Sequence, residues 1–277
     1  YNKIENIKEK VDVIIDFSVP VATFEILKYA KNNKIPIVIS LPHSGEYVTM
    51  KMSNNLKDVV LSNMDWYLDK LYSFLKDLGF TIITNNVSRY VIDVNRDIKS
   101  SKSNDCYKQN YIYTRTTFDK EIYKKELTRE EINARIKDFY IPYHNALLKA
   151  LEEKNKYFRK VFLIDLHSFG RPIFSDIILG NDNGKSANKD FFLKVKKLFE
   201  EENFIVNENK PFSGGYITKF YGKELKNCES IQIELNYKTY IDKREFGEEE
   251  FPAVNKELFK STQEKMKRIF TKLKNIK

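Results

Sequence analysis

Short runs of β-branched and aliphatic residues alternate with longer amphipathic segments along most of this chain, and this alternation restricts the fold more than any other feature. The runs expected to form strands are residues 11–17, 35–39, 80–84, 90–94, 161–166 and 230–235. The expected helices, where apolar side chains recur at three- and four-residue steps, cover residues 22–33, 56–78, 129–156, 190–203 and 254–274. Strands that alternate with helices form a mostly parallel or mixed sheet with helices on both faces. The sequence therefore predicts an α/β protein with three α/β/α layers.

The connections between these elements are expected to be irregular in three places. Residues 42–53 are predicted to form a loop directly after a strand, and residues 97–128 a long, polar, tyrosine-rich excursion. Residues 181–188 are rich in turn formers. Gly79 lies where the helix predicted over 56–78 ends, and we expect it to cap that helix.

Composition excludes several classes of protein. Hydrophobic residues make up 42% and charged residues 31% of the 277 residues, which is the balance of a globular protein. No run approaches the roughly 18 apolar residues that a membrane helix needs. Cys106 and Cys228 are far apart, which argues against a disulfide scaffold and a cysteine-built zinc site. Because no secretory signal pattern is seen either, we expect a cytoplasmic protein.

The net charge of +9 is compatible with nucleic acid, an anionic membrane or an acidic small molecule as partner. The lysines are spread along the chain, and no arginine-rich or aromatic-basic motif stands out. The basic helix predicted over 254–274 also carries acidic residues, which favours a packed surface helix over a membrane-bound one. We therefore expect neither nucleic acid nor membrane as partner.

Two histidines lie close to the ends of predicted strands. His43 opens H-S-G-E, so that Glu46 follows it at nearly one helical turn and both side chains can reach the same point. His167 ends the apolar run V-F-L-I-D-L-H, where alternation places it on the same face as Asp165. The carboxyl ends of strands are where open α/β sheets bind ligands. A histidine that is simply satisfied within the core remains an alternative for His167.

Two further strands carry charged residues that are expensive to bury. In S-I-Q-I-E-L-N, Glu234 needs a cation or hydrogen-bond donors, either in an active site or in a structural ion pair. Arg89 and Arg96 bracket the run Y-V-I-D-V-N, and their guanidinium groups suit a substrate carboxylate. A structural pairing of these arginines with Asp93 or Asp97 is the alternative.

Two imidazoles and one carboxylate can form a zinc site that leaves a fourth position for water. Such an ion lowers the pKa of its water and polarises a carbonyl group. A separate glutamate must then take up the proton of the water and return it to the leaving amine. Glu234 suits this role, although sequence spacing permits such convergence without proving it.

Seven short motifs follow one another along the chain. They are P-H-S-G-E (42–46), the segment around Asp65, S-R-Y-V-I-D-V-N-R-D (88–97), Y-H-N-A-L (143–147), L-I-D-L-H-S (163–168), F-S-G-G-Y-I-T (212–218) and I-Q-I-E-L-N (231–236). From about residue 35 to residue 242 the chain resembles the N-formylglutamate amidohydrolase family, which is similar to the zinc carboxypeptidases in fold.

The resemblance implies a role for each matching residue. His43, Glu46 and His167 would hold one Zn²⁺ or another divalent ion, and Glu234 would act as general base and acid. Substrate would be bound by Arg89, Asn95, Arg96, Gly214, Gly215 and Tyr216. Arg96 would also help to stabilise the oxyanion, and the two glycines would let the backbone approach the ligand. For His144, a structural role, orientation of a neighbour and substrate contact all stay open.

The first residues resemble a different family. V-D-V-I-I-D-F-S-V-P, running into N-K-I-P-I-V-I-S, is similar to an internal piece of dihydrodipicolinate reductase. The glycine-rich dinucleotide turn and the catalytic stretch of that enzyme are missing, so reductase activity is not expected. We therefore predict a structural lead-in over residues 1–35 and a zinc amidohydrolase domain over residues 36–277.

The function implied is hydrolysis of a small N-acyl amino acid, with N-formyl-L-glutamate the simplest substrate and histidine degradation its metabolic setting. A metallocarboxypeptidase or a deacylase with another amide substrate would use the same ligand set. A nucleotide-binding oxidoreductase is the alternative from a different class, and a basic nucleic-acid-binding protein is a third.

Overall fold

A six-stranded sheet forms the centre of the molecule, which is described by a computed structural model over residues 36–99, 110–242, 247 and 252–275. Its strands are β1 (Ile37–Leu41), β2 (Thr81–Thr84), β3 (Val161–Phe169), β4 (Ile177–Gly180), β5 (Val206–Glu208) and β6 (Cys228–Asn236), in the order β2-β1-β3-β6-β4-β5. Neighbours from β2 to β6 are parallel, β4 runs antiparallel to β6, and β5 is parallel to β4. The predicted α/β class with a mixed, mostly parallel sheet is confirmed.

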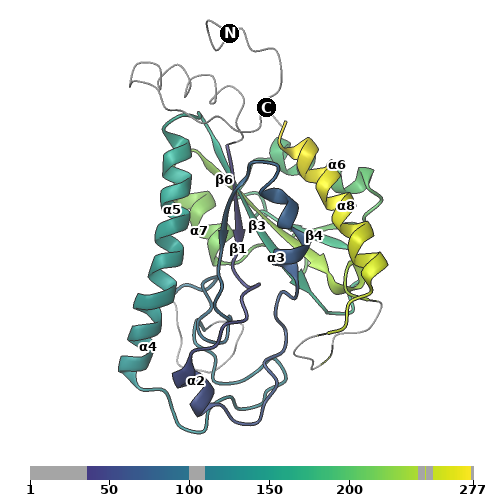
Figure 1. The fold of residues 1–277 in the computed structure, drawn as a ribbon. Coiled ribbons are helices and arrows are strands. Elements are labelled where there is room, and N and C mark those ends of the chain that lie inside the picture. The colour runs from purple at the N-terminus through teal and green to yellow at the C-terminus, as the bar shows by residue number, and fades with distance from the viewer. Residues whose placement is uncertain (1–35, 100–109, 243–246, 248–251, 276–277) are drawn as a thin grey trace, which may run out of the picture.

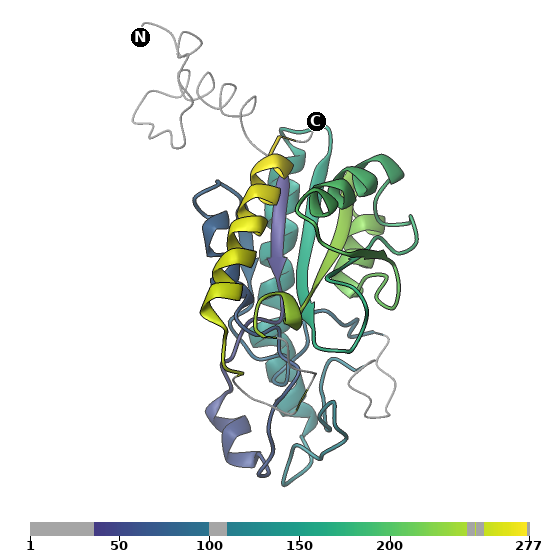
Figure 2. The same cartoon turned by 90° about the vertical axis from the view of Figure 1, so that its right-hand side faces the viewer.

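Helices cover both faces of this sheet (Figure 1). One face packs against α5 (Ile141–Asn155) and α7 (Tyr216–Glu224), and α4 (Arg129–Arg135) continues into α5 through a π-helical segment, Ile136–Tyr140. On the other face lie α3 (Leu68–Leu71), α6 (Lys189–Glu201) and α8 (Lys256–Leu273). The short α2 (Met50–Asn55) lies with irregular segments beyond the carboxyl end of β1, as both ribbon views show (Figure 2).

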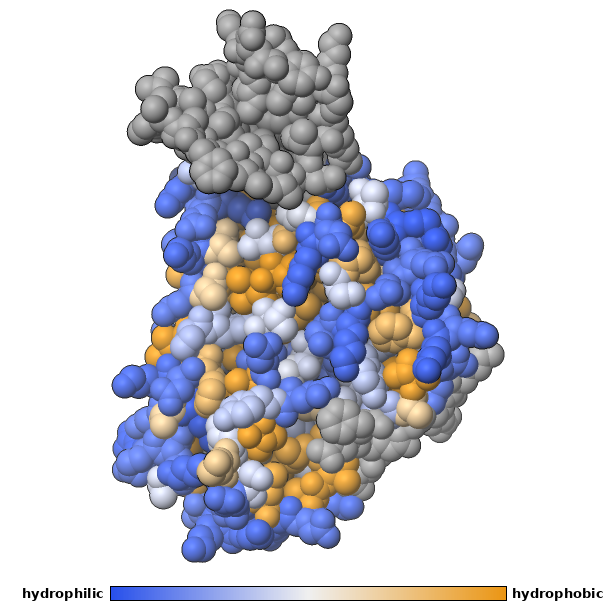
Figure 3. Space-filling view, viewed as in Figure 1, coloured by the Kyte–Doolittle hydropathy of each residue, from blue (hydrophilic) through white to orange (hydrophobic). Residues whose placement is uncertain are grey.

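Alternation along the central strands builds one core on each side of the sheet. Ile39 and Ile164 pack into the core that α6 and α8 complete, whereas Val38 and Leu163 pack into the core of α5 and α7. All four side chains are fully buried, as expected for a strand covered on both faces. In the space-filling view, hydrophilic side chains lie along both long edges of the molecule (Figure 3).

Most of the strongly periodic elements form where the sequence predicts them. The strands expected over 35–39, 80–84, 161–166 and 230–235 correspond to β1, β2, β3 and β6. The helix expected over 129–156 is found with its π-helical segment, and α6 and α8 match the other two late helices. Gly79 adopts φ +79°, the left-handed conformation expected after a helix end.

Three expectations are wrong. Residues 56–78 do not form one helix: only α3 and a 3₁₀ turn over Ser73–Leu75 are helical, and Asn63 and Tyr67 adopt left-handed backbone conformations. The run 90–94 is buried but forms turns. In these two segments distant side chains bind backbone carbonyls, such as Tyr90 at Ser62 and Arg135 at Val91, and local propensity yields to such contacts. The helix α2 begins inside the loop expected over 42–53 and is capped locally, since Thr49 Oγ1 accepts from the Met52 N–H. The strands β4 and β5 and the helix α7 were not predicted.

Residues 110–128 form neither helix nor strand, in agreement with the expected excursion, and contain only isolated bridges such as Arg115 with Glu121. The strand and helix predicted over 11–17 and 22–33 lie outside the described residues. The domain boundary near residue 35 therefore stays a prediction. Among the described residues, none of the helices combines the length and the apolar character that a membrane crossing requires.

Candidate active site

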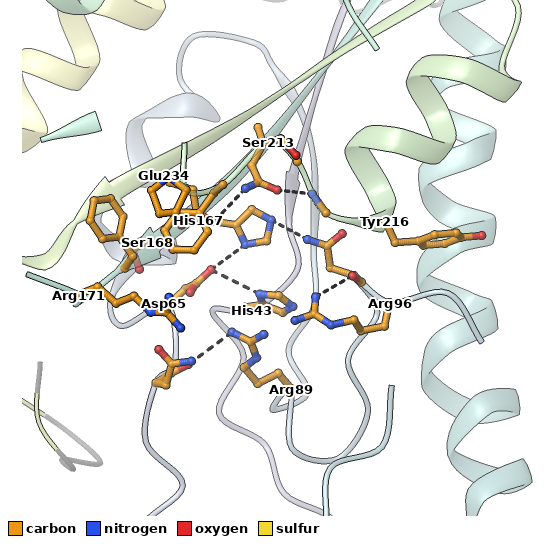
Figure 4. A pocket seen from close by; sticks show the side chains of 18 of the residues that line it. His43, Asp65, Arg89, Arg96, His167, Ser168, Arg171, Ser213, Tyr216 and Glu234 are labelled. Carbon is orange, nitrogen blue, oxygen red and sulfur yellow. Dashed lines mark hydrogen bonds and ion pairs between the residues drawn. The ribbon is translucent and has the colours of Figure 1, made fainter. Parts of the chain in front are cut away.

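Two histidines and one aspartate meet beyond the carboxyl ends of the central parallel strands. His43 follows β1 by two residues, His167 lies near the end of the neighbouring β3, and Asp65 belongs to the irregular segment before α3. Asp65 Oδ2 lies 3.0 Å from His167 Nδ1 and 3.6 Å from His43 Nδ1. All three side chains are at most 4% exposed. Figure 4 shows them turned toward one another.

These three side chains suit a divalent metal ion. They offer one ligand atom each within 4.8 Å of one another. Tetrahedral zinc separates neighbouring ligand atoms by about 3.3 Å, which agrees with the observed separations. Nδ1 of His43 is buried and makes no hydrogen bond, as expected for a nitrogen whose lone pair is reserved for an ion.

The opposite nitrogen of each imidazole faces a carboxylate. His43 Nε2 lies 2.7 Å from Asp93 Oδ1, and His167 Nε2 lies 3.0 Å from Asp165 Oδ2. A carboxylate that accepts from Nε2–H leaves Nδ1 as the free lone pair and fixes the plane of the ring. Both histidines therefore present Nδ1 to the position that Asp65 also faces.

Both of these carboxylates are completely buried and held by several donors. Asp93 accepts from Arg89 at 2.9 Å, from the Asn95 backbone N–H at 2.8 Å and from the Tyr113 hydroxyl. Asp165 accepts from Ser40 Oγ at 2.6 Å and from Thr218 Oγ1 at 3.3 Å. Since a buried carboxylate must be paired or hydrogen-bonded, these contacts satisfy the oxygens of both side chains beside the histidines.

The charges of this cluster shift one another's protonation. Burial alone would raise the pKa of Asp65, but hydrogen bonds and charge interactions with His167 and His43 lower it well below its usual range. Burial likewise opposes the charged form of His167, yet Asp165 and Asp65 raise the pKa of His167 well above its usual range. For Asp93, burial is outweighed by interactions with His43, Arg96 and Arg89, which lower the pKa of its carboxyl. The lowered pKa of Asp65 favours its ionised form, the form in which a carboxylate binds a divalent ion.

Glu234 lies beside the cluster on the neighbouring strand. It is the register partner of His167 in the parallel pair of β3 and β6. Gln232 Nε2 donates to Glu234 Oε1 at 2.9 Å, while Gln232 Oε1 accepts from the Gly215 N–H at 2.6 Å. Burial raises the pKa of Glu234 to about 8, although the charge of His167 opposes the shift. A carboxyl group with such a pKa can both take up and release a proton near neutral pH.

Glu46 is not brought to the two histidines, which corrects the expectation that it supplies the third ligand. Its side chain is exposed and lies outside the three-residue cluster. The backbone at Gly45 packs so tightly against residues 85–86 that a Cβ there would lie 2.3 Å from Asn86 C, and Tyr47 N–H then donates to Asn86 O at 3.1 Å. The chain is therefore held straight after His43 and does not make the helical turn that would bring Glu46 back.

The cluster opens into a cavity of about 790 Å³. The predicted substrate-binding residues all line it, together with the predicted shuttle: Arg89, Asn95, Arg96, Gly214, Gly215, Tyr216 and Glu234. Arg89 is engaged with Asp93, Tyr113 and the carbonyl of Asn63, which matches the alternative of a structural pairing. Arg96 and Arg171 lie on opposite sides of the cluster in the close-up (Figure 4).

The two glycines act on the site differently from one another. A Cβ on Gly215 would lie 2.3 Å from Asn95 Nδ2, so this position must be glycine for the Asn95 amide to cross it. Both ends of the Asn95 amide are held in place. Asn95 Oδ1 accepts from Ile217 N–H at 2.8 Å, and Nδ2 lies 3.1 Å from His167 Nε2. Gly214 adopts φ +127°, a conformation that favours glycine.

Sequence reasoning did not identify Asp65 as a possible metal ligand or Arg171 as a residue of the cavity. Asp65 occupies an apolar position in the helical pattern of Leu61, Leu68 and Tyr72, where an unpaired carboxylate would be costly, and this was the signal that could have identified it. Arg171 lies 5.9 Å from the Phe212 ring centroid in a loop without periodicity, where no local signal exists.

His144 lies outside the lining of the cavity. Its Nε2 lies 2.9 Å from the Val94 carbonyl and its Nδ1 3.0 Å from the Tyr221 hydroxyl. These contacts join α5 to α7 and to the segment before Asn95, so the geometry favours the structural alternative.

Known proteins resemble this chain over most of its length. The profile of the N-formylglutamate amidohydrolase family matches residues 35–241, which is most of the chain. The chain belongs to that family. A second profile, of the N-terminus of dihydrodipicolinate reductase, matches residues 1–64 and so covers the segment that resembles this enzyme.

Two sequence relatives and one solved structure are also similar to this chain. An N-formylglutamate deformylase of Pseudomonas putida is 29% identical over 229 residues, covering 76% of this chain and 84% of the relative. Its counterpart in Pseudomonas aeruginosa is 27% identical over 233 residues, covering 79% and 87%. The crystal structure of N-formylglutamate amidohydrolase from Ralstonia eutropha JMP134 shares the fold, with a TM-score of 0.70, 22% identity and coverage of 87% and 95%.

Proposed function

We propose that this protein hydrolyses N-formyl-L-glutamate to formate and glutamate with a divalent ion, Zn²⁺ in the first instance, held by His43, Asp65 and His167. The observation that carries the proposal is the meeting of these three buried side chains beside Glu234 in one cavity. Membership of the N-formylglutamate amidohydrolase family and the names of the two Pseudomonas relatives support the substrate. A cytoplasmic location and a role in histidine degradation stay predictions from the sequence.

The donor set agrees with an open catalytic zinc site, in which three protein ligands leave room for water or substrate. When bound, the ion would supply a Lewis acid that lowers the pKa of water and polarises the amide carbonyl. Asp93 and Asp165 would hold the two imidazoles in the required orientation, since each accepts from an Nε2–H.

Glu234 moves the proton in this proposal. Its carboxylate takes up the proton of the attacking water, and the same Oε atom then returns it to the amide nitrogen as the C–N bond breaks. The raised pKa of about 8 suits a group that must hold a proton between these two steps. Gln232 keeps the carboxylate in place through its contact at 2.9 Å.

The negative charge of the substrate would be met by the arginines that line the cavity. Arg89 donates to Asp93 at 2.9 Å, and Arg96 lies 3.8 Å from the same carboxylate. Arg96 and Arg171 line the cavity on opposite sides of the cluster and are the candidates for the substrate carboxylates. A guanidinium group binds a carboxylate through two parallel N–H donors, which selects for acid groups at defined positions. Arg96 is also the proposed oxyanion-stabilising residue, since it lines the cavity next to Asn95, whose Nδ2 lies 3.1 Å from His167 Nε2.

Formate release from N-formyl-L-glutamate, measured with and without a chelator, tests the proposal. We expect activity that the chelator abolishes and that added Zn²⁺ restores. Glu234→Gln should keep the metal and lose activity by a factor of about 10² to 10⁴. Full activity of this metal-loaded variant would contradict the role of Glu234. A panel of other N-acyl amino acids and short peptides separates the deformylase from a deacylase or a carboxypeptidase with the same ligands.

A further inference from the structure

The segment that carries Asp65 has an unusual backbone environment. Residues 62–66 form neither helix nor strand, although the sequence predicts a helix through them. Several of their carbonyl groups accept hydrogen bonds from side chains that lie far away in the sequence. Tyr90 donates its hydroxyl to Ser62 O at 2.7 Å, and Tyr240 donates to Trp66 O at 2.8 Å. Tyr237 donates to Met64 O.

We propose that Tyr90, Tyr237 and Tyr240 are positioning residues that hold Asp65 where it can bind the metal ion. The inference rests on the proposed function, because it concerns the affinity of the proposed metal site. The three hydroxyl groups bind carbonyls on both sides of Asp65, whereas the Asp65 carboxylate itself faces the two histidines.

The backbone of this segment needs such donors. In a helix, the carbonyls of residues 62–66 would accept from N–H groups four residues later. The left-handed conformations of Asn63 and Tyr67 prevent this, and a buried carbonyl without a donor is unfavourable. The three tyrosine hydroxyls replace part of the missing helical hydrogen bonds and thereby stabilise the unwound conformation that brings Asp65 to the histidines.

The three tyrosines are themselves firmly placed. Tyr90 and Tyr240 are at most 1% exposed and Tyr237 is 8% exposed, so that little water competes for their hydroxyls. Tyr237 and Tyr240 lie at the turn that follows β6, the strand of Glu234. These contacts therefore connect the end of β6, which carries Glu234, directly to residues 62–66, which carry Asp65.

Tyr90 connects the same segment to the other side of the site. Its neighbour Arg89 donates from Nη1 to Asn63 O at 3.4 Å and from Nη2 to Asp93, the carboxylate that contacts His43 Nε2. One short stretch of chain thus orients two of the three proposed ligands, Asp65 and His43. Loss of a tyrosine hydroxyl should weaken metal binding without removing any ligand.

The test uses Tyr90→Phe, Tyr240→Phe and the double variant, which keep the aromatic rings and remove only the hydroxyls. Tyr72→Phe is the matched control: Tyr72 is equally buried, but its hydroxyl contacts Met266 Sδ at 3.7 Å instead of the segment. Zn²⁺ affinity is measured by competition with a chelating dye, and the absorption spectrum of the Co²⁺-loaded protein reports the ligand geometry. Thermal unfolding of the metal-free proteins shows whether each variant is folded.

We expect each single variant to bind Zn²⁺ about 10-fold more weakly and to alter the Co²⁺ spectrum, as loss of groups that orient ligands commonly does. Tyr72→Phe should bind within about twofold of the unchanged protein. A folded double variant with unchanged Zn²⁺ affinity and Co²⁺ spectrum would overturn the inference while leaving the proposed function intact. If the unchanged protein itself takes up no metal, the proposed function fails, and the inference fails with it.

Discussion

His144 offers a prediction whose sign and size follow from the structure. The carbonyl of Val94 can only accept, so His144 Nε2 at 2.9 Å carries a hydrogen, and in the neutral ring Nδ1 accepts from the Tyr221 hydroxyl at 3.0 Å. Both nitrogens are therefore satisfied without a positive charge. Burial lowers the pKa of His144 to about 4, against an ordinary value of 6.5.

This shift makes the stability of the protein depend on pH. Between pH 6.5 and pH 4 the unfolded chain binds a proton at this position and the folded chain does not, so the free energy of unfolding falls as the pH falls. A shift of 2.5 units, from 6.5 to about 4, corresponds to a limit of about 3.4 kcal/mol at 1.36 kcal/mol per unit. Roughly 2 kcal/mol of this is lost between pH 7 and pH 5, because the folded state is still neutral there.

The assay is urea unfolding of the metal-free protein at pH 7, 6 and 5, compared with the variant His144→Gln. Glutamine does not titrate, and its amide can donate and accept in place of the two ring nitrogens. We expect the variant to be less stable at pH 7 but to lose about 2 kcal/mol less than the unchanged protein between pH 7 and pH 5. Parallel losses in the two proteins would refute the assignment of His144 as a buried neutral ring.

Three further predictions concern other positions. Asp93→Asn removes the carboxylate behind a ligand imidazole, and dye competition should show Zn²⁺ affinity reduced by about 10- to 100-fold; unchanged affinity would exclude an orienting role. Gly215→Ala places a Cβ 2.3 Å from Asn95 Nδ2. We therefore expect a lower kcat/KM and, in urea unfolding, a free energy of unfolding reduced by about 1–3 kcal/mol. An unaffected variant would mean that Asn95 is not held against this glycine. Burial raises the pKa of the Cys228 thiol to about 12. In a Cys106→Ser variant at pH 8, Cys228 should therefore react with a disulfide reagent at least about 100-fold more slowly in the folded protein than in the unfolded protein. Equal rates in the two states would contradict its burial.

The parts of the site that rest on strand periodicity could be predicted from the sequence. The alternation in V-F-L-I-D-L-H and I-Q-I-E-L-N identifies β3 and β6, and it places Asp165 on the same face as His167. The two strands run parallel and place His167 beside Glu234, a convergence that the sequence pattern permitted and that only the family resemblance implied. His43, directly after β1, is found by the same reasoning.

The position of Asp65 beside the two histidines could not be predicted in this way. Residues 56–78 have helical periodicity, but the part around Asp65 is unwound, and its carbonyls accept from the hydroxyls of Tyr90, Tyr237 and Tyr240. Such contacts between distant parts of the chain leave no trace in local spacing. Glu46, in contrast, has favourable spacing but lies on a stretch of chain held extended against residues 85–87.

The short strands escaped prediction for a different reason. β4 and β5 contain only Ile177–Gly180 and Val206–Glu208, too few residues for alternation to be recognised. The apolar run over residues 90–94 shows the reverse error, since its side chains are buried in turns that surround Asp93. Burial alone therefore does not distinguish a strand from a buried turn.

Metal content after purification and dialysis tests the central claim most directly, with Asp65→Ala and Glu46→Ala measured beside the unchanged protein. We expect about one equivalent of a divalent ion in the unchanged protein and in Glu46→Ala, and almost none in a folded Asp65→Ala. Retention of the ion by Asp65→Ala together with its loss from Glu46→Ala would contradict the arrangement of His43, Asp65 and His167 as the metal site.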